Sequence, residues 1–302
     1  MAHPLALLPS PARDVWHLGA VSLRAQALAV VAGILVAIVV AELRYRRAGG
    51  PPGAIADIAA WAVPAALVPA AVAALTAAAR APLWRAAHTA AAAAGFPGAV
   101  ALGLLAAWLA CRRMRAPVPA APVAVLADES PPAAPPRRVR LAPVLGAGAP
   151  AVAFGQAVGL LGDWFAQQGI GRPSSLPWSI AISPLHRPPG YENYATFAPL
   201  FIYQVIWDVT AGVAVIAAAG RWNLAGGRVF ALGCAAYAIG GFGVFWLGIG
   251  HLPVILGLPA GVLGDVAVLA GAVIYLLRTR RTGPKSVQNP HKPTLERDSP
   301  VM

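Results

Sequence analysis

The sequence predicts an all-α integral membrane protein with about seven transmembrane helices, its N-terminus outside and its C-terminus cytoplasmic. Of its 302 residues, 58% are hydrophobic and only 11% are charged. A soluble domain carries about a quarter charged residues, so most side chains of this chain must face lipid or one another. Helices are expected because lipid offers no hydrogen-bond partner to an unpaired backbone amide.

Seven apolar stretches are long enough to cross the bilayer, since about 20 apolar residues in a helix span about 30 Å of hydrocarbon. They are rich in alanine, glycine and proline, which is typical of lipid-embedded helices that pack closely. The stretches are 21–41, 54–79, 89–111, 141–161, 197–219, 229–249 and 252–277.

The basic residues predict the orientation, because Lys and Arg are retained on the cytoplasmic side of a membrane. With the N-terminus outside, most of the 23 Lys and Arg residues fall on inner segments. Attraction to anionic lipid head groups is sufficient to explain the net charge of +12. Because these residues are scattered rather than gathered in one groove lined with aromatics, no nucleic-acid partner is expected.

The chain divides into five segments according to composition. Residues 116–140 are rich in Pro and Ala and predict a flexible linker, and the polar C-terminus predicts a disordered tail. The segments are an outer N-terminal segment 1–20, transmembrane helices one to three in 21–115, a cytoplasmic linker 116–140, helices four to seven in 141–277 with an outer loop 162–196, and a basic cytoplasmic tail 278–302.

Several motifs occur in order along the chain. The outer loop contains Gly159-Leu-Leu-Gly-Asp163 and Gly171-Arg172-Pro-Ser-Ser-Leu-Pro-Trp178. Asp57-Ile-Ala-Ala-Trp-Ala-Val-Pro64 lies in the second apolar stretch, Gly95-Phe-Pro-Gly98 in the third, and Phe197-Ala-Pro-Leu-Phe-Ile-Tyr-Gln204 opens the fifth. Together they resemble the prolipoprotein diacylglyceryl transferase family, whose signatures run roughly GRxGNxxNxExxGRPTxLPW and FHPxxLYE.

The resemblance implies a reaction and its partners. Members of the family move the diacylglyceryl group of phosphatidylglycerol to the lipobox cysteine of prelipoproteins at the bacterial cytoplasmic membrane. The implied partners are therefore phosphatidylglycerol or another anionic phospholipid, and prelipoprotein signal peptides. Such chemistry favours arginines, because the guanidinium binds phosphate oxygens in pairs and stays charged.

The sequence departs from the family pattern at its charged positions. The resemblance therefore implies a copy with weak or absent catalysis, and it leaves open whether the protein is an enzyme. The replacements are Leu160 and Ala71 for arginines, Asp163 and Ala166 for asparagines, Gln168 and Gln204 for glutamates, Ala198 for histidine, Gln26 for tyrosine, and Gly240-Gly241 with Phe245 for a Gly-Arg pair and a glutamate.

Six residues remain as candidates for contact with a lipid phosphate or for lining a cavity. Gln204 and Asp208 are four residues apart on one predicted helical face and are expected to point together into the bundle. No catalytic residue is assigned, and neither a cofactor nor a metal is predicted, because Cys111 and Cys234 lack ligand spacing. The candidates are Arg172, Asp163, Gln168, Tyr203, Gln204 and Asp208.

Two alternatives to an active transferase stay open. One is a non-catalytic paralogue that binds lipid or lipoprotein in a retained cavity. The other is a small transporter subunit built around Asp57, Asp208 and Asp265, since acids inside membrane spans are costly and are functional candidates by default.

Overall fold

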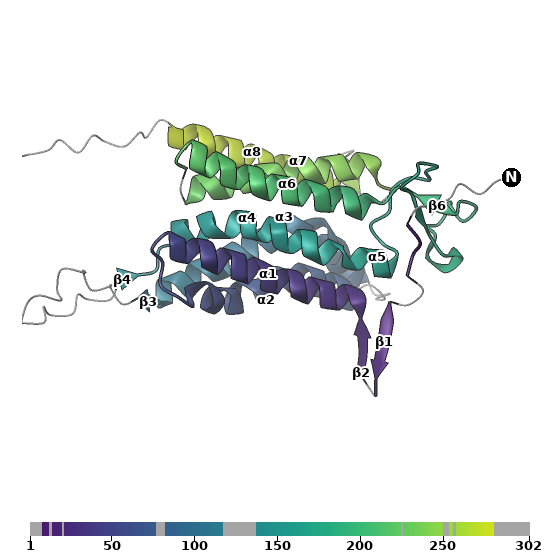
Figure 1. Ribbon diagram of the computed structural model, residues 1–302, viewed down its shortest axis with the longest axis horizontal. Coiled ribbons are helices and arrows are strands. Elements are labelled where there is room, and N and C mark those ends of the chain that lie inside the picture. The colour runs from purple at the N-terminus through teal and green to yellow at the C-terminus, as the bar shows by residue number, and fades with distance from the viewer. Residues whose placement is uncertain are drawn as a thin grey trace, which may run out of the picture.

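The computed structural model describes residues 8–11, 14–19, 21–76, 82–116, 137–224, 226–249, 254–255 and 258–280. It is a bundle of long helices (Figure 1). The helices are α1 (Ala25–Arg47), α2 (Ala54–Thr76), α3 (Pro82–Arg113), α4 (Leu141–Leu160), α6 (Leu200–Arg221), α7 (Gly227–Leu247) and α8 (Ala260–Arg280), with a short helix α5 (Gly162–Ala166) after α4.

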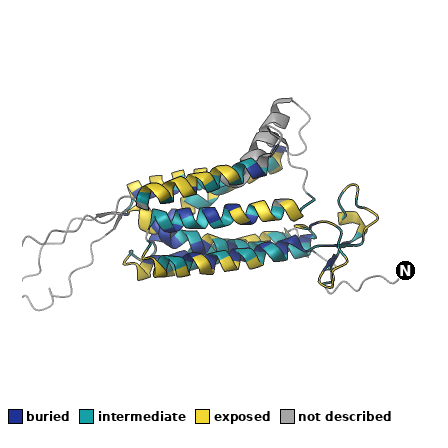
Figure 2. Ribbon diagram, turned by 90° about the horizontal axis from the view of Figure 1, so that it is seen from above, coloured by how far each residue is buried: buried dark blue, intermediate teal, exposed yellow. Residues whose placement is uncertain are grey.

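Six helices of the described part are long and apolar enough to cross a membrane, namely α1, α2, α4 together with α5, α6, α7 and α8. Large apolar residues of these helices are exposed, among them Leu35, Val39, Trp61 and Leu75. Exposed positions recur along the helices of the bundle (Figure 2). Such a surface suits lipid rather than water. The predicted membrane fold is therefore confirmed, and the count of seven stays a prediction because the side chains of the first half of α3 lie outside the described residues.

Glycines allow α1 and α4 to pack closely as antiparallel helices. Gly33 of α1 lies against Gly155 and Gly159 of α4, and Gly162 lies against Gln26 and Ala29 near the start of α1. Lipid provides little hydrophobic driving force for helix association, so close backbone approach between small residues supplies the contact energy instead. Helix α4 also contacts α6 and α7, and α2 packs along α3, which makes α4 the centre of the bundle.

The two ends of the bundle differ in structure. At one end lie the hairpin of β1 (Val15–Leu18) and β2 (Val21–Arg24), helix α5, and a loop whose strands β5 (Ile180–Ala181) and β6 (Thr196–Phe197) pair antiparallel (Figure 1). The loop has its own core, in which Ile180 and Phe197 are fully buried. At the other end β3 (Arg115–Ala116) pairs with β4 (Arg137–Arg138).

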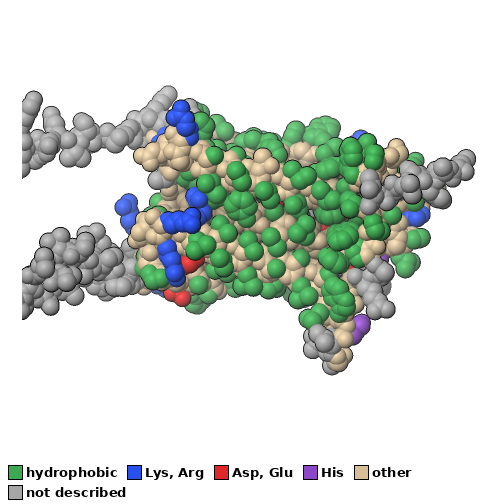
Figure 3. All heavy atoms as spheres, viewed as in Figure 1, with side chains coloured by type: hydrophobic (Ala, Val, Ile, Leu, Met, Phe, Trp, Pro, Cys, Tyr) green, Lys and Arg blue, Asp and Glu red, His purple; other side chains and the backbone are tan. Residues whose placement is uncertain are grey.

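Basic side chains gather at the end of the bundle opposite the N-terminus (Figure 3). They include the last turns of α1 and α3, with Arg44, Arg46, Arg47, Arg112 and Arg113. This distribution is the one from which the orientation was predicted. It supports a cytoplasmic assignment for that end, which stays a prediction.

Several helix boundaries differ from the predicted stretches. The first helix begins at Ala25 rather than at residue 21, because Val21–Arg24 forms β2 against β1. The third begins at Pro82, seven residues before the predicted start. The last begins at Ala260, after a hairpin of β7 (Val254–Ile255) and β8 (Leu258–Pro259). Most of the predicted linker and tail lies outside the described residues.

Candidate functional site

Three positions of the family signature meet where α1 begins. The Gln26 side-chain amide donates hydrogen bonds to Asp163 Oδ1 at 3.0 Å and to Gln168 Oε1 at 3.2 Å. Gly162 makes this meeting possible, because a Cβ atom there would lie 2.8 Å from the Gln26 Cα. Helix α5 ends at Ala166, and the next residue, Gln167, adopts a left-handed conformation with φ 51°, which turns the chain so that Gln168 reaches Gln26.

The outer loop holds the backbone of Arg172 and leaves its guanidinium exposed. The Arg172 N–H donates to the Leu247 carbonyl at 3.3 Å, and its carbonyl accepts from Ala198 at 3.1 Å. By contrast, Arg187 donates from its guanidinium to the carbonyls of Ile182 and Glu192. Of the two arginines in the described part of the loop, Arg172 is therefore the one whose guanidinium makes no hydrogen bond to the protein.

Glu192 is an acid near the far end of this loop and is bound locally. Its carboxylate accepts a 2.8 Å hydrogen bond from the Gly190 N–H. Hydrogen bonds from the backbone N–H groups of Glu192 and Gly190 lower the pKa of Glu192 below its usual range, so it is charged at neutral pH. The hydrogen bond closes the turn at residues 190–192. Among the described residues, Glu192 forms no ion pair with Arg172.

Tyr203 lies at the junction between the loop and α6. Its hydroxyl accepts a 2.7 Å hydrogen bond from the Trp178 indole N–H. The pair joins the Leu-Pro-Trp end of the loop motif to the start of α6.

Gln204 and Asp208 confirm the expectation that they point together into the bundle. The Gln204 amide donates to Asp208 Oδ1 at 2.9 Å, and the two side chains are 8% and 2% exposed. The other carboxyl oxygen, Oδ2, has no hydrogen-bond partner among the described residues. A buried polar atom without a partner costs about 1–3 kcal/mol, and Asp208 Oδ2 is such an atom.

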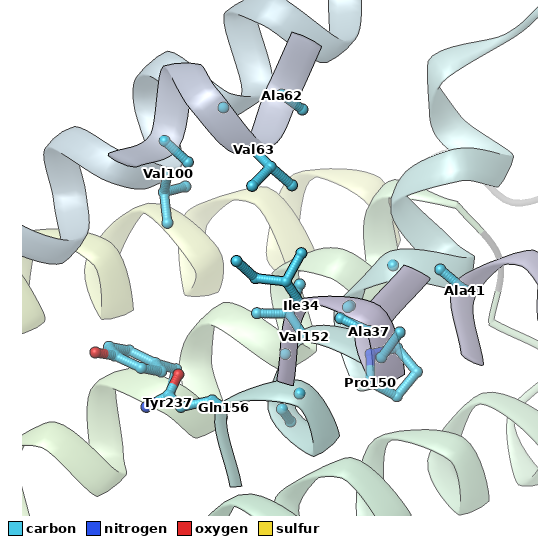
Figure 4. Close-up of a pocket in the computed structure, with 18 of the residues that line it drawn as sticks. Ile34, Ala37, Ala41, Ala62, Val63, Val100, Pro150, Val152, Gln156 and Tyr237 are labelled. Carbon is cyan, nitrogen blue, oxygen red and sulfur yellow. The ribbon is translucent and has the colours of Figure 1, made fainter. Parts of the chain in front are cut away.

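Asp208 lines a cavity of about 600 Å³ between α1, α2, α3, α4, α6 and α7. Gln156 of α4 and Tyr237 of α7 line the same cavity, and a hydrogen bond joins their side chains (Figure 4). Nearly all the other lining residues are apolar and many are small, such as Ala37, Ala62 and Gly148. The cavity thus combines an apolar wall with a small polar cluster.

The acids of the transporter hypothesis do not share one site. Asp57 is exposed and lines a separate groove between α2 and α3 with Trp61 and Arg113. Asp265 of α8 lies beside Gly241. Asp265 and Asp208 both interact electrostatically with the Tyr237 hydroxyl. The transporter hypothesis stays a prediction.

The structure therefore brings together some candidates and separates others. Asp163 and Gln168 form one cluster with Gln26, whereas Gln204 and Asp208 form a second, and Arg172 stands apart from both. Within the described residues, neither cluster forms an ion pair with Lys or Arg. The ion pair Arg46–Glu42 lies at the other end of α1 from Gln26.

Two residues of the second cluster were missed by sequence reasoning. Gln156 is an isolated amide inside an apolar stretch, and Tyr237 is a hydroxyl in a glycine- and alanine-rich one. The available signal was that polar groups are costly in lipid, so each of these two residues is expected to have a hydrogen-bond partner inside the bundle. Their pairing across α4 and α7 could be found only from the packing.

We expect Gln204→Leu to destabilise the protein by about 1–3 kcal/mol, because both oxygens of Asp208 would then be buried without a partner. The double variant Gln204→Leu, Asp208→Leu should recover most of that loss, since it removes the donor and the acceptor together. Thermal unfolding of the two single variants and the double variant measures the coupling. Additive effects would contradict a direct interaction.

These features define a multi-pass helical membrane protein whose apolar cavity holds a small polar cluster and whose loop folds over one end of the bundle. A family model described as prolipoprotein diacylglyceryl transferase matches residues 13–277. The chain therefore belongs to the prolipoprotein diacylglyceryl transferase family, as the sequence motifs predicted.

Named relatives agree with this assignment. Phosphatidylglycerol–prolipoprotein diacylglyceryl transferase 2 of Streptomyces coelicolor is 36% identical over 280 residues, which cover 90% of this chain and 81% of the relative. The corresponding transferase of Frankia alni is 36% identical over 282 residues, or 91% and 68% of the two chains. Transferase 1 of Streptomyces coelicolor is 32% identical over 311 residues, or 98% and 81%. The protein is a multi-pass protein of the bacterial cytoplasmic membrane.

Proposed function

We propose that this protein binds phosphatidylglycerol or another anionic phospholipid at the outer face of the membrane and transfers the diacylglyceryl group slowly or not at all. Prelipoprotein signal peptides are the proposed second partner. The relatives' names supply the substrates. The proposal that transfer is weak comes from the side chains of this chain.

The family reaction makes specific electrostatic demands. The cysteine thiol loses its proton to a base, its sulfur forms a bond to a glycerol carbon of the lipid, and the bond from that carbon to the phosphate oxygen breaks, releasing glycerol phosphate. The thiolate is the nucleophile. The negative charge on the leaving phosphate must be stabilised, and preorganised cations do this most effectively in a low-dielectric site.

The observation that carries the proposal is the cluster of Gln26, Asp163 and Gln168. At these signature positions the chain places two neutral amides around one acid, joined by hydrogen bonds to each other. Leu160, at the position of the family's arginine, is an apolar residue of the cavity wall. No cation for the phosphate is built into this cluster, and Asp163 is its one candidate base for the thiol.

Lipid binding has separate support. The exposed Arg172 guanidinium, at the end where the loop folds, can form paired hydrogen bonds with a phosphate. The apolar outer surface of the helices and the cavity inside the bundle suit acyl chains. With seven spans and the N-terminus outside, as we propose, this end and segment 162–196 lie at the outer leaflet.

We expect the purified protein to lipidate a lipobox peptide at least about 100-fold more slowly than a relative with the complete signature, because loss of one charge-stabilising group alone costs about 10²–10³ in rate. Mass spectrometry of the peptide, with phosphatidylglycerol in the same micelles, measures the product. Retention of phosphatidylglycerol by the same preparation, reduced by Arg172→Ala, supports binding without turnover. A rate equal to that of the relative would overturn the proposal.

A further inference from the structure

A groove between α2 and α3 carries an inference that goes beyond the proposed function. We propose that it binds a phospholipid whose head group carries both a phosphate and a primary ammonium, such as phosphatidylethanolamine, with Arg113 on the phosphate and Asp57 on the ammonium. The groove has a volume of about 450 Å³ and shares no lining residue with the central cavity. It is therefore a separate site.

The groove opens on a face of α2 that is turned away from the bundle core. On another face of this helix, Ile55 and Ile58 are 6% and 4% exposed and belong to the core. Asp57 is exposed, and Trp61 in the groove is 64% exposed. Because α2 is long and apolar enough to cross a membrane, this face contacts lipid, and a phospholipid can enter the groove from the bilayer.

Two opposite charges line the groove without a partner. Asp57 lies in the first turn of α2 and Arg113 is the last residue of α3, so both are at the end of the bundle where the basic residues gather (Figure 3). Within the part of the chain that the structure describes, neither side chain forms a hydrogen bond or an ion pair. Charged groups in membrane spans are costly and usually pair, so a ligand that supplies both counter-charges is favoured.

The two charges select the head group. The Arg113 guanidinium can bind phosphate oxygens through paired hydrogen bonds, and a primary ammonium has three N–H donors for the Asp57 carboxylate. Phosphatidylglycerol offers Asp57 only an uncharged glycerol, and phosphatidylcholine has a quaternary ammonium without an N–H donor. A head group with a phosphate and a primary ammonium therefore complements the groove better than either.

The apolar part of the groove follows the order of groups in a phospholipid. Trp61 and Leu109 line it four residues from Asp57 and Arg113 respectively, or about 6 Å further along the helix axes toward the middle of the bundle. Small residues such as Ala60 leave room beside them. The head group thus meets the two charges while the acyl chains lie along Trp61 and Leu109.

Arg112 provides a matched control for Arg113. It is the preceding residue and carries the same charge, but its guanidinium lies over the Trp108 ring, 4.6 Å from the centroid, and it does not line the groove. The variants Arg112→Gln and Arg113→Gln have the same net charge. A difference between them therefore reports on the groove and not on the general attraction of lipid head groups to basic residues.

The test uses the full chain in detergent and native mass spectrometry with palmitoyl-oleoyl phosphatidylethanolamine. Arg113→Gln should weaken its binding by at least about tenfold, equivalent to about 1.4 kcal/mol, whereas Arg112→Gln should stay within about twofold of the natural chain. Asp57→Asn should also weaken it by about tenfold, yet leave binding of phosphatidylglycerol with the same acyl chains within about twofold.

A further variant, Ala60→Phe, fills the groove without changing a charge and should weaken binding of phosphatidylethanolamine by at least about tenfold. Gel filtration confirms that each variant is folded. The proposal is overturned if Arg112→Gln and Arg113→Gln bind this lipid equally, if Asp57→Asn weakens both lipids to the same extent, or if Ala60→Phe binds like the natural chain. The assay contains no peptide, so its outcome is independent of whether the protein is a transferase.

Discussion

Restoring the family's charged side chains is expected to raise the rate of diacylglyceryl transfer by at least about 100-fold. The triple variant is Leu160→Arg, Gln168→Glu and Ala198→His. Leu160 lines the cavity, so an arginine there gains access to a lipid phosphate, and one preorganised group of this kind contributes about 10²–10³ in rate. The glutamate and the histidine supply candidate bases for the thiol.

The matched control replaces Leu160 with Gln and keeps the other two changes. Glutamine is polar and long but uncharged, so it separates the electrostatic effect from the effect of size. The measurement is the initial rate of peptide lipidation with phosphatidylglycerol, followed by mass spectrometry. If the arginine and glutamine variants react at the same rate, the missing cation at this position is not what limits transfer.

The bundle could be predicted from the sequence because lipid imposes simple rules on composition. The predicted stretches beginning at 54 and 141 start at the observed first residues of α2 and α4. The predicted start of the first helix at residue 21 was wrong for a local reason. Val21–Arg24 is apolar enough to extend a span, yet it pairs with Val15–Leu18 as a hairpin, and pairing between strands does not appear in hydropathy.

The candidate site was predictable where spacing within one helix decides it. Gln204 and Asp208 are four residues apart, and the helix places them in contact. The contact of Gln26 with Asp163 and Gln168 depends instead on how α1 packs against α4 and α5. The cavity has the same origin, since small residues on several helices create space that no single stretch reveals.

Gly155→Leu is expected to have the largest effect on stability, at least about 3 kcal/mol, because a larger side chain would separate α1 from α4. A Cβ atom at Gly155 would lie 2.7 Å from the Ala37 Cβ, and Gly33 faces it across the same contact. The rigid backbones on both sides leave no side chain that can move aside. Lipid then competes for the separated surfaces, since it solvates apolar helices as well as a neighbouring helix does.

The measurement for Gly155→Leu is the melting temperature of the detergent-solubilised protein. It is the temperature at which heating leaves half of the protein monodisperse. Gly271→Leu is the matched control, because a Cβ atom at Gly271 has nothing within 4 Å. Gly155→Ala should lie between the two, since it adds only the Cβ. Equal melting temperatures for Gly155→Leu and Gly271→Leu would mean that α1 and α4 are held together by other contacts. The hydrogen bond from Gln26 to Asp163, which joins α1 to α5, is one such contact.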